Sequence, residues 1–288
     1  MDGELWKGLY RAVFEVGKQA HNYRVQYGHV WIVLVYLWAV LHDRPVSWAC
    51  SDRNWPASQR HWPKPSPSTM SRRLRRPEVR AMLDDLLQRL NAQLGRSGLC
   101  WMDGKPLVIG GHSKDPDAGY GRAAGCKSKG YKLHAIWDAS GALVTHQVHP
   151  INVSEQKVAR SMIDQLEGGG YLVADAGYDS NPLYEHAGQR GYQMLAPRRY
   201  RKAKGLGHHR HSIYRLRAIQ MLQQEHGRAL LRRRTAIERQ FGCLGNFPGG
   251  LGPLPNWVRR LRRVELWVTA KLTINSLRIL TRKQRLAA

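Results

Sequence analysis

The feature that most constrains the fold is a change in the spacing of apolar residues about a third of the way along the chain. From Leu5 to about Leu94, apolar side chains recur every three or four residues, which predicts helices. After the sequence Gly-Arg-Ser-Gly at residues 95–98, the segment Leu99–Ile109 is typical of a β-strand. We therefore predict an all-α region over residues 1–97 and a separate, sheet-containing domain over residues 98–288.

The second region alternates between strand and helix patterns. Residues 131–138 (YKLHAIWD) and 142–149 (ALVTHQVH) flank a short turn, which predicts a β-hairpin. Residues 171–174 (YLVA) form a short apolar run that is typical of a buried strand. Helices are expected over residues 154–166, 181–189, 213–245 and 261–283, the first of them capped by Ser154. This order predicts an α/β fold in which helices cover a mixed sheet.

The charge of the chain indicates the kind of partner it binds. Lys and Arg total 46 against 21 Asp and Glu, a net charge of +25 over 288 residues. Such an excess favours nucleic acid or an anionic membrane surface. The longest apolar run, Val30–Leu41, is shorter than the roughly 20 residues that cross a bilayer, so we predict a buried helix and no membrane partner. With no secretory signal and four scattered cysteines, we expect free thiols in a cytoplasmic protein that associates with the nucleoid.

One helix in the N-terminal region has the composition of a DNA-reading helix. Ser68 or Thr69 is expected to cap it, and hydroxyls and amides at its start can meet phosphates or base edges. The arginines that follow are Arg72, Arg73, Arg75 and Arg76. With residues 46–50 as a supporting helix, this segment resembles a helix-turn-helix motif. The alternative is a basic helix face that is simply solvated.

A second basic segment lies within the C-terminal domain. Residues 197–217 contain eight Lys or Arg and no acid, and we treat them as an insertion. They form either a solvated loop or a surface that meets phosphate. The candidate DNA contacts here are Arg198, Arg199, Arg201, Lys202 and Lys204.

Two aspartates fall where strands can present them to a ligand. Asp175 follows the apolar run 171–174 directly, and ligand sites of open α/β sheets collect at the carboxyl ends of strands. Gly177 is expected to permit a tight turn beside it. Asp103 lies within the first predicted strand, although the Asp-Gly dipeptide by itself favours a turn.

A glutamate lies on a helix farther along the chain. Glu238 shares a helix face with Arg234, four residues earlier, so the pair is either part of a site or an ordinary surface ion pair. The apolar residues expected to face inward on this helix are Ile237, Phe241 and Leu244. The other acids near these positions are Asp115, Asp117, Asp138 and Asp179. We expect these four to be solvated loop or turn residues, with Asp138 the nearest to a site.

Together, Asp103, Asp175 and Glu238 resemble the catalytic triad of DDE transposases. The resemblance includes residues 113–115 (SKD), 129–134 (KGYKLH) and 175–179 (DAGYD), and Arg234 with Glu238. It is closest to bacterial insertion-sequence transposases of the type-four and type-five groups, which implies an RNase H-like fold. In the type-four signature a Tyr and a Lys accompany the Arg and Glu; here Leu231 and Gly245 take those places.

The resemblance implies an enzyme that cleaves and joins phosphodiesters with two Mg²⁺ or Mn²⁺ ions. Asp103 would bridge the ions, Asp175 and Glu238 would hold one each, and Arg234 would contact phosphate or orient Glu238. Terminal inverted repeats and target DNA would be the partners, bound by a homodimer. Two alternatives remain: a catalytically decayed DNA-binding repressor, and an RNase H-like nuclease without strand transfer.

Overall fold

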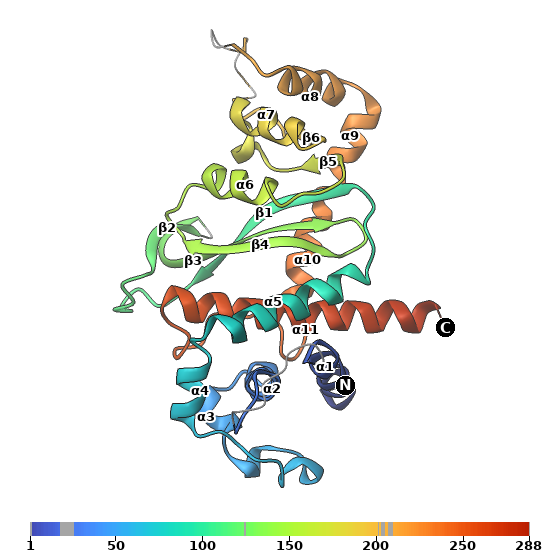
Figure 1. The fold of residues 1–288 in the computed structure, drawn as a ribbon. Helices are drawn as coiled ribbons and strands as arrows, with labels where there is room; N and C mark the ends of the chain where they lie inside the picture. The colour runs from blue at the N-terminus through green and yellow to red at the C-terminus, as the bar shows by residue number, and fades with distance from the viewer. Residues whose placement is uncertain are drawn as a thin grey trace. The chain divides into compact units, whose positions relative to one another are not determined.

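The computed structural model describes residues 2–17, 26–123, 125–200, 202, 205–206 and 210–287. Its contacts divide the chain into two compact units, one formed by residues 1–93 with 243–288 and the other by residues 94–242 (Figure 1). The boundary after residue 93 lies close to the one expected at residue 97. The segment from Cys243 onward, expected within the second domain, instead groups with the N-terminal helices.

The first unit is built from helices. Its elements are α1 (Asp2–Gly17), α2 (His29–Leu41), α3 (Val46–Ala49), η1 (Asp52–Asn54), η2 (Ala57–Gln59), α4 (Pro67–Arg73), α5 (Pro77–Ala92) and α11 (Leu261–Ala287). The long helix α11 runs beside α5 and also contacts α1 and α2 (Figure 1). Helix α2 is buried from Ile32 to Leu41, which confirms the predicted buried helix. No helix of the described residues is both long and apolar enough to span a bilayer.

A buried lysine ties α11 into this unit. The Nζ atom of Lys271 donates hydrogen bonds to the carbonyls of Val40 at 2.8 Å and Gly249 at 3.0 Å, and it pairs with Asp43 Oδ1 at 2.6 Å. The Lys271 side chain has no exposed surface. Because these partners satisfy all three ammonium protons, the charge can be buried, and α11 is fixed to the end of α2.

The second unit contains one mixed sheet. Its strands are β1 (Leu99–Val108), β2 (Gly119–Ala123), β3 (Cys126–Asp138), β4 (Leu143–Pro150), β5 (Gly170–Val173) and β6 (Tyr192–Leu195). The order is β2-β3-β1-β5-β6, and β4 also pairs with β3. Strand β3 is antiparallel to its three neighbours, whereas β5 is parallel to β1 and β6. The mixed α/β prediction and the β3–β4 hairpin are confirmed, while β2 and β6 were not predicted.

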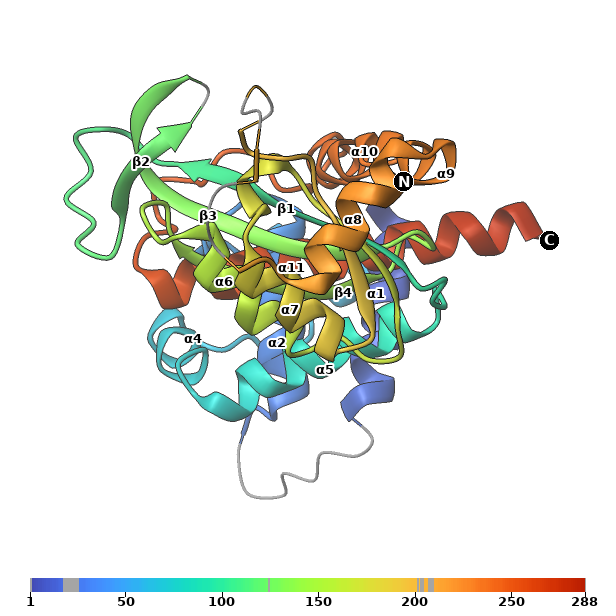
Figure 2. The ribbon, with the colours of Figure 1, turned by 90° about the horizontal axis from the view of Figure 1, so that it is seen from above.

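Helices flank this sheet (Figure 2). They are α6 (Glu155–Ile163), α7 (Asn181–Gln189), α8 (Ile213–Gln223), α9 (Glu225–Arg232) and α10 (Thr235–Gly245), with the turn η3 (Ala176–Tyr178) after β5. The helical pattern expected over residues 213–245 is confirmed as three helices, because Gln224 has an extended backbone and a turn at residues 233–234 separates α9 from α10. On α10, the Phe241 ring meets Trp137 of β3 edge to face at 4.8 Å. This contact packs α10 against the sheet.

Candidate active site

Asp103 and Asp175 lie side by side because of the register of two parallel strands. Trp101 of β1 pairs directly with Val173 of β5. Asp103 follows Trp101 by two residues and Asp175 follows Val173 by two residues. Paired residues of parallel strands share a face of the sheet, and so do residues two apart along a strand. The sheet thus brings together two aspartates that are distant in sequence.

Two glycines let these strands begin so close together. Tyr171 N donates a hydrogen bond to Gly98 O at 2.8 Å. Gly170 has φ of +138°, and a Cβ there would lie 1.9 Å from Gly98 O. No other residue fits at position 170, so this glycine fixes the register that places Asp103 beside Asp175.

The turn after Asp175 is stabilised by the aspartate itself. Asp175 Oδ1 accepts a hydrogen bond from Gly177 N at 2.7 Å. The expected reason for Gly177 needs correction, since it is not among the glycines with positive φ. A Cβ at Gly177 would lie 3.0 Å from Asp175 Oδ1 and 3.4 Å from Glu155 Oε2. Its small size therefore leaves room for two carboxylates.

Glu155 is an acidic neighbour that the sequence interpretation missed. It opens α6, where its Oε1 pairs with Lys132 Nζ of β3 at 2.6 Å. The next residue, Gln156, donates from Nε2 to Gly177 O at 3.0 Å and so ties the start of α6 to the turn after Asp175. A signal was available, because a Glu directly after an N-cap Ser is placed at a helix start. What could not be seen is that this helix start meets the aspartates.

The electrostatics of Asp103 confirm that these groups are close. Burial raises the pKa of its carboxyl to about 6. The Gly104 amide, which donates to Asp103 Oδ1 at 2.7 Å, and the charge of Arg234 lower this pKa. The charges of Asp175 and Glu155 raise it. A cation beside Asp103 would favour the charged form of this carboxyl.

A tyrosine hydroxyl lies among the same carboxylates. Tyr178 is 1% exposed, and its Oη has no hydrogen-bond partner among the described residues. Burial, followed by the charges of Glu155, Asp103 and Asp175, raises its pKa well above the usual range. Buried hydroxyls normally have a hydrogen-bond partner, so the Tyr178 hydroxyl is a donor that a ligand at the acidic cluster could pair with.

Glu238 lies outside this cluster. Its Oε1 is 3.4 Å from Arg234 Nη2, and 61% of its side chain is exposed. Ile237, Phe241 and Leu244 are buried as expected, so Glu238 occupies the polar face of α10. The charge of Arg234 also lowers the pKa of Asp103, so Arg234 interacts with Asp103 as well as with Glu238.

The donor set fits a divalent cation in part. Asp103 and Asp175 supply the carboxylate oxygens that Mg²⁺ and Mn²⁺ prefer, and the charges of Asp175 and Glu155 near Asp103 favour a cation there. Among the described residues, however, no three His, Cys, Asp or Glu side chains are arranged to hold a metal ion. The two aspartates fit such an ion, whereas Glu238 joins them only if its side chain leaves Arg234.

Three of the four other acids are not solvated, contrary to expectation. Asp115 accepts a hydrogen bond from Tyr131 Oη at 2.7 Å and is buried. Asp138 accepts from the Ser97 and Ser140 amides and is buried in the hairpin turn, where it pairs with Cys100 rather than approaching Asp103. Asp179 pairs with Arg215 at 2.7 Å. In each case, a partner distant in sequence stabilises the carboxylate.

The basic helix of the first unit differs from the prediction in its cap and its extent. Ser66 caps α4, accepting from Thr69 N at 3.2 Å, so Ser68 and Thr69 are not the cap. Arg72, Arg75 and Arg76 are at least partly exposed, and Arg75 and Arg76 follow the end of α4. Arg73 is only 9% exposed, so its location does not favour the predicted contact with DNA.

The basic segment of the second unit is partly held by acids from outside it. Arg215 pairs with Asp179, which also accepts from Arg199 N at 2.9 Å. The side chains of Arg199 and Lys202 are exposed, and Arg198 donates to Gly205 O. Arg201 and Lys204 lie outside the described residues. The exposed cations remain predicted contacts for phosphate.

A strongly basic α/β protein in which neighbouring strands bring two carboxylates together has features of enzymes that act on phosphodiesters. The family described as the Transposase DDE domain matches residues 95–273, more than half of the chain, and the chain belongs to this family. Neither the curated proteins nor the solved structures include a match. Membership confirms the predicted DDE transposase, and it implies DNA binding and a transposition-related nuclease or nucleotidyl-transferase activity. The type-four or type-five grouping stays a prediction.

Proposed function

We propose that this protein is an insertion-sequence transposase that cleaves DNA strands at the ends of its element and transfers them to a target. The observation that carries the proposal is the register that sets Asp103 beside Asp175 in a family of DDE transposases. With it we propose an RNase H-like fold for the second unit and a helix-turn-helix role for α3 and α4. The type-four or type-five grouping belongs to the same proposal.

Three acids would hold two Mg²⁺ or Mn²⁺ ions. Bound divalent ions activate a water or 3′-hydroxyl and neutralise charge on the transferring phosphate. Asp175 lies beside Asp103. Glu238 pairs with Arg234, whose charge lowers the pKa of Asp103. We infer that, when DNA is bound, Glu238 breaks its ion pair with Arg234 and joins Asp103 and Asp175 at the metal site. The freed Arg234 is then available to contact a phosphate near the cut.

The DNA partners would be the terminal inverted repeats and the target. Arg72, Arg75 and Arg76 at α4 would bind the repeats, and Arg198, Arg199 and Lys202 would hold DNA near the acids. We also propose a homodimer that joins two element ends and a location at the nucleoid. The net charge of +25 supports contacts to many phosphates.

The test is a reaction of the purified full chain with a plasmid that carries the DNA flanking its gene and with a separate target plasmid. We expect excision that requires Mg²⁺ or Mn²⁺, together with covalent joining of the ends to the target. Cutting without joining would instead support a nuclease. Binding without cutting would support a decayed repressor, consistent with Leu231 and Gly245 in the signature.

A further inference from the structure

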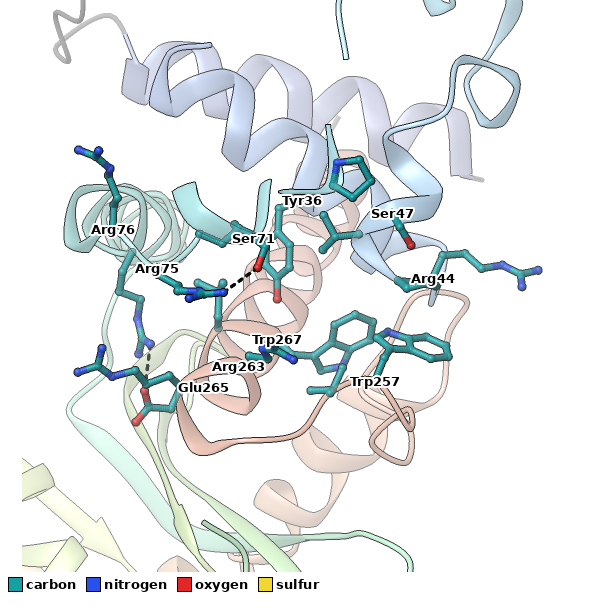
Figure 3. A pocket seen from close by; sticks show the side chains of 18 of the residues that line it. Tyr36, Arg44, Ser47, Ser71, Arg75, Arg76, Trp257, Arg263, Glu265 and Trp267 are labelled. Atoms are coloured by element: carbon teal, nitrogen blue, oxygen red, sulfur yellow. Dashed lines mark hydrogen bonds and ion pairs between the residues drawn. The ribbon is translucent and has the colours of Figure 1, made fainter. Parts of the chain in front are cut away.

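A pocket of about 660 Å³ lies in the first unit, and the proposed acid site does not use it. Four parts of the chain line it: Tyr36 of α2, residues 44–47 at α3, residues 67–80 around the end of α4, and residues 257–267 at the start of α11 (Figure 3). Both ends of the chain therefore contribute to one hollow.

The lining of this pocket is strongly basic. It contains one acid, Glu265, and six arginines: Arg44, Arg75, Arg76, Arg80, Arg262 and Arg263. Glu265 Oε2 forms an ion pair with Arg80 Nη1 at 3.2 Å, and Arg75 Nη2 donates a hydrogen bond to Ser71 Oγ at 3.1 Å. No carboxylate partner is found within the described part of the chain for Arg44, Arg76, Arg262 or Arg263. Four such arginines at one pocket give it a positive charge that favours an anion.

An exposed tryptophan lies at the same pocket. The Trp257 side chain is 43% exposed, whereas Trp267 beside it is buried. Figure 3 shows the two tryptophan rings next to each other, with Arg263 beside Trp267 and Arg75 farther away beside Ser71. A large aromatic surface left open beside arginines suits a ligand that has both an anionic group and a flat or apolar part. A nucleotide has both.

We propose that this pocket binds the phosphodiester backbone of DNA, with Arg75 and Arg76 from the N-terminal region and Arg262 and Arg263 from α11 acting on one strand. Trp257 packs against a sugar or base of that strand. The inference rests on the proposed function, because it makes the C-terminal helix part of the surface that binds DNA.

The transposase family and the net charge of +25 favour DNA over an acidic protein segment. The cationic groups of the lining are all arginine, whose forks match the two oxygens of a phosphodiester. Pro67 and Ser71 of α4 line the pocket, and Arg72, the residue after Ser71, is exposed. Exposed cations both in the lining and next to it in the chain fit the regularly spaced charges of a nucleic acid strand.

The test compares two pairs of exposed cations on the same helix. Arg262→Ala/Arg263→Ala removes the pocket pair, and Arg282→Ala/Lys283→Ala removes a matched pair from the other end of α11. Binding of a short fluorescein-labelled DNA duplex is measured by anisotropy over a series of salt concentrations in EDTA. The slope of log K against log salt should become less steep by about 2 for the pocket pair, and by much less for the matched pair.

The aromatic contact is tested in the same assay. Trp257→Ala should weaken DNA binding roughly tenfold while the slope stays unchanged, and Trp257→Phe should retain most of the affinity. Thermal unfolding of each variant verifies that the fold persists. An aromatic side chain that serves only packing would change unfolding and leave affinity as it is.

Two results would overturn the proposal. Equal effects of the two cation pairs would mean that charge acts diffusely over the surface. Binding of polyglutamate is measured in the same way. If Arg262→Ala/Arg263→Ala weakened polyglutamate binding as much as DNA binding, the pocket would be a site for acidic proteins. Because EDTA excludes cleavage, a protein that cuts no DNA but shows the pocket effect would contradict the proposed catalysis alone.

Discussion

Arg234 Nη2 pairs with Glu238 Oε1 at 3.4 Å, and the charge of Arg234 also lowers the pKa of Asp103. Arg234 thus interacts both with the third acid of the proposed triad and with Asp103. An exposed ion pair four residues apart on a helix is worth only about 0.3–0.5 kcal/mol. Releasing Glu238 therefore costs little beside the free energy of binding a divalent ion and DNA.

The first prediction concerns the charge of Arg234. Arg234→Ala removes a cation that lowers the pKa of Asp103, so that pKa should rise further above about 6. Arg234→Lys should keep it near the wild-type value, because the charge remains. Carbon-13 NMR titration of labelled aspartate in the metal-free protein measures both variants. A fall in this pKa on loss of Arg234 would contradict the described electrostatics.

The second prediction is that Asp103 makes the metal-free protein less stable near neutral pH. Its folded pKa of about 6 exceeds the ordinary value of 3.8, so the folded state binds more protons than the unfolded state between these values. The free energy of unfolding should therefore decrease as pH rises from about 4 to about 6. Asp103→Asn removes this contribution and should be more stable than wild type at pH 7, by about 1–3 kcal/mol.

Urea unfolding in EDTA, run across the same pH range, measures this difference. It should vanish below about pH 4, where the carboxyl is protonated in both states. Adding Mg²⁺ should stabilise the wild type and leave Asp103→Asn nearly unchanged, because ligand binding to the folded state adds stability. A variant no more stable than wild type at pH 7 would contradict the raised pKa of Asp103.

The third prediction compares two buried tyrosines of the second unit. Tyr178→Phe removes a hydroxyl without a partner among the described residues, so the free energy of unfolding should stay the same or rise by up to about 1 kcal/mol. Tyr131→Phe removes the hydrogen bond to buried Asp115 and should cost about 1.5–3 kcal/mol. Urea unfolding without metal compares them. Equal losses would mean that Tyr178 has a structural partner.

Local patterns predicted those parts of the fold that depend on local sequence. The alternation of residues 131–149 and the apolar run before Asp175 were sufficient for the hairpin, for β5 and for the position of Asp175 at a strand end. Strand β2 was missed because three of its neighbouring or internal residues, Gly119, Gly121 and Gly125, mark turns as readily as strands. Strand β6 has only four residues.

The sequence could not predict hydrogen-bond and ion-pair partners that are distant in the chain and come together only in the fold. Asp138 and Asp179 seemed solvated because Ser97 and Arg215, which satisfy them, are distant in sequence. Glu155 was missed for the same reason. The association of α11 with the N-terminal helices depends on Lys271, whose acceptors lie on other elements.

The most direct measurement of the central claim is metal-dependent cleavage of element-end DNA by Asp175→Asn. Asp85→Asn, which changes a partly exposed acid on α5, is the matched control. If Asp175 and Asp103 form the metal-binding centre, Asp175→Asn should bind end DNA like the wild type and cut none of it, while the control cuts normally. Strand cleavage retained by Asp175→Asn would contradict the account.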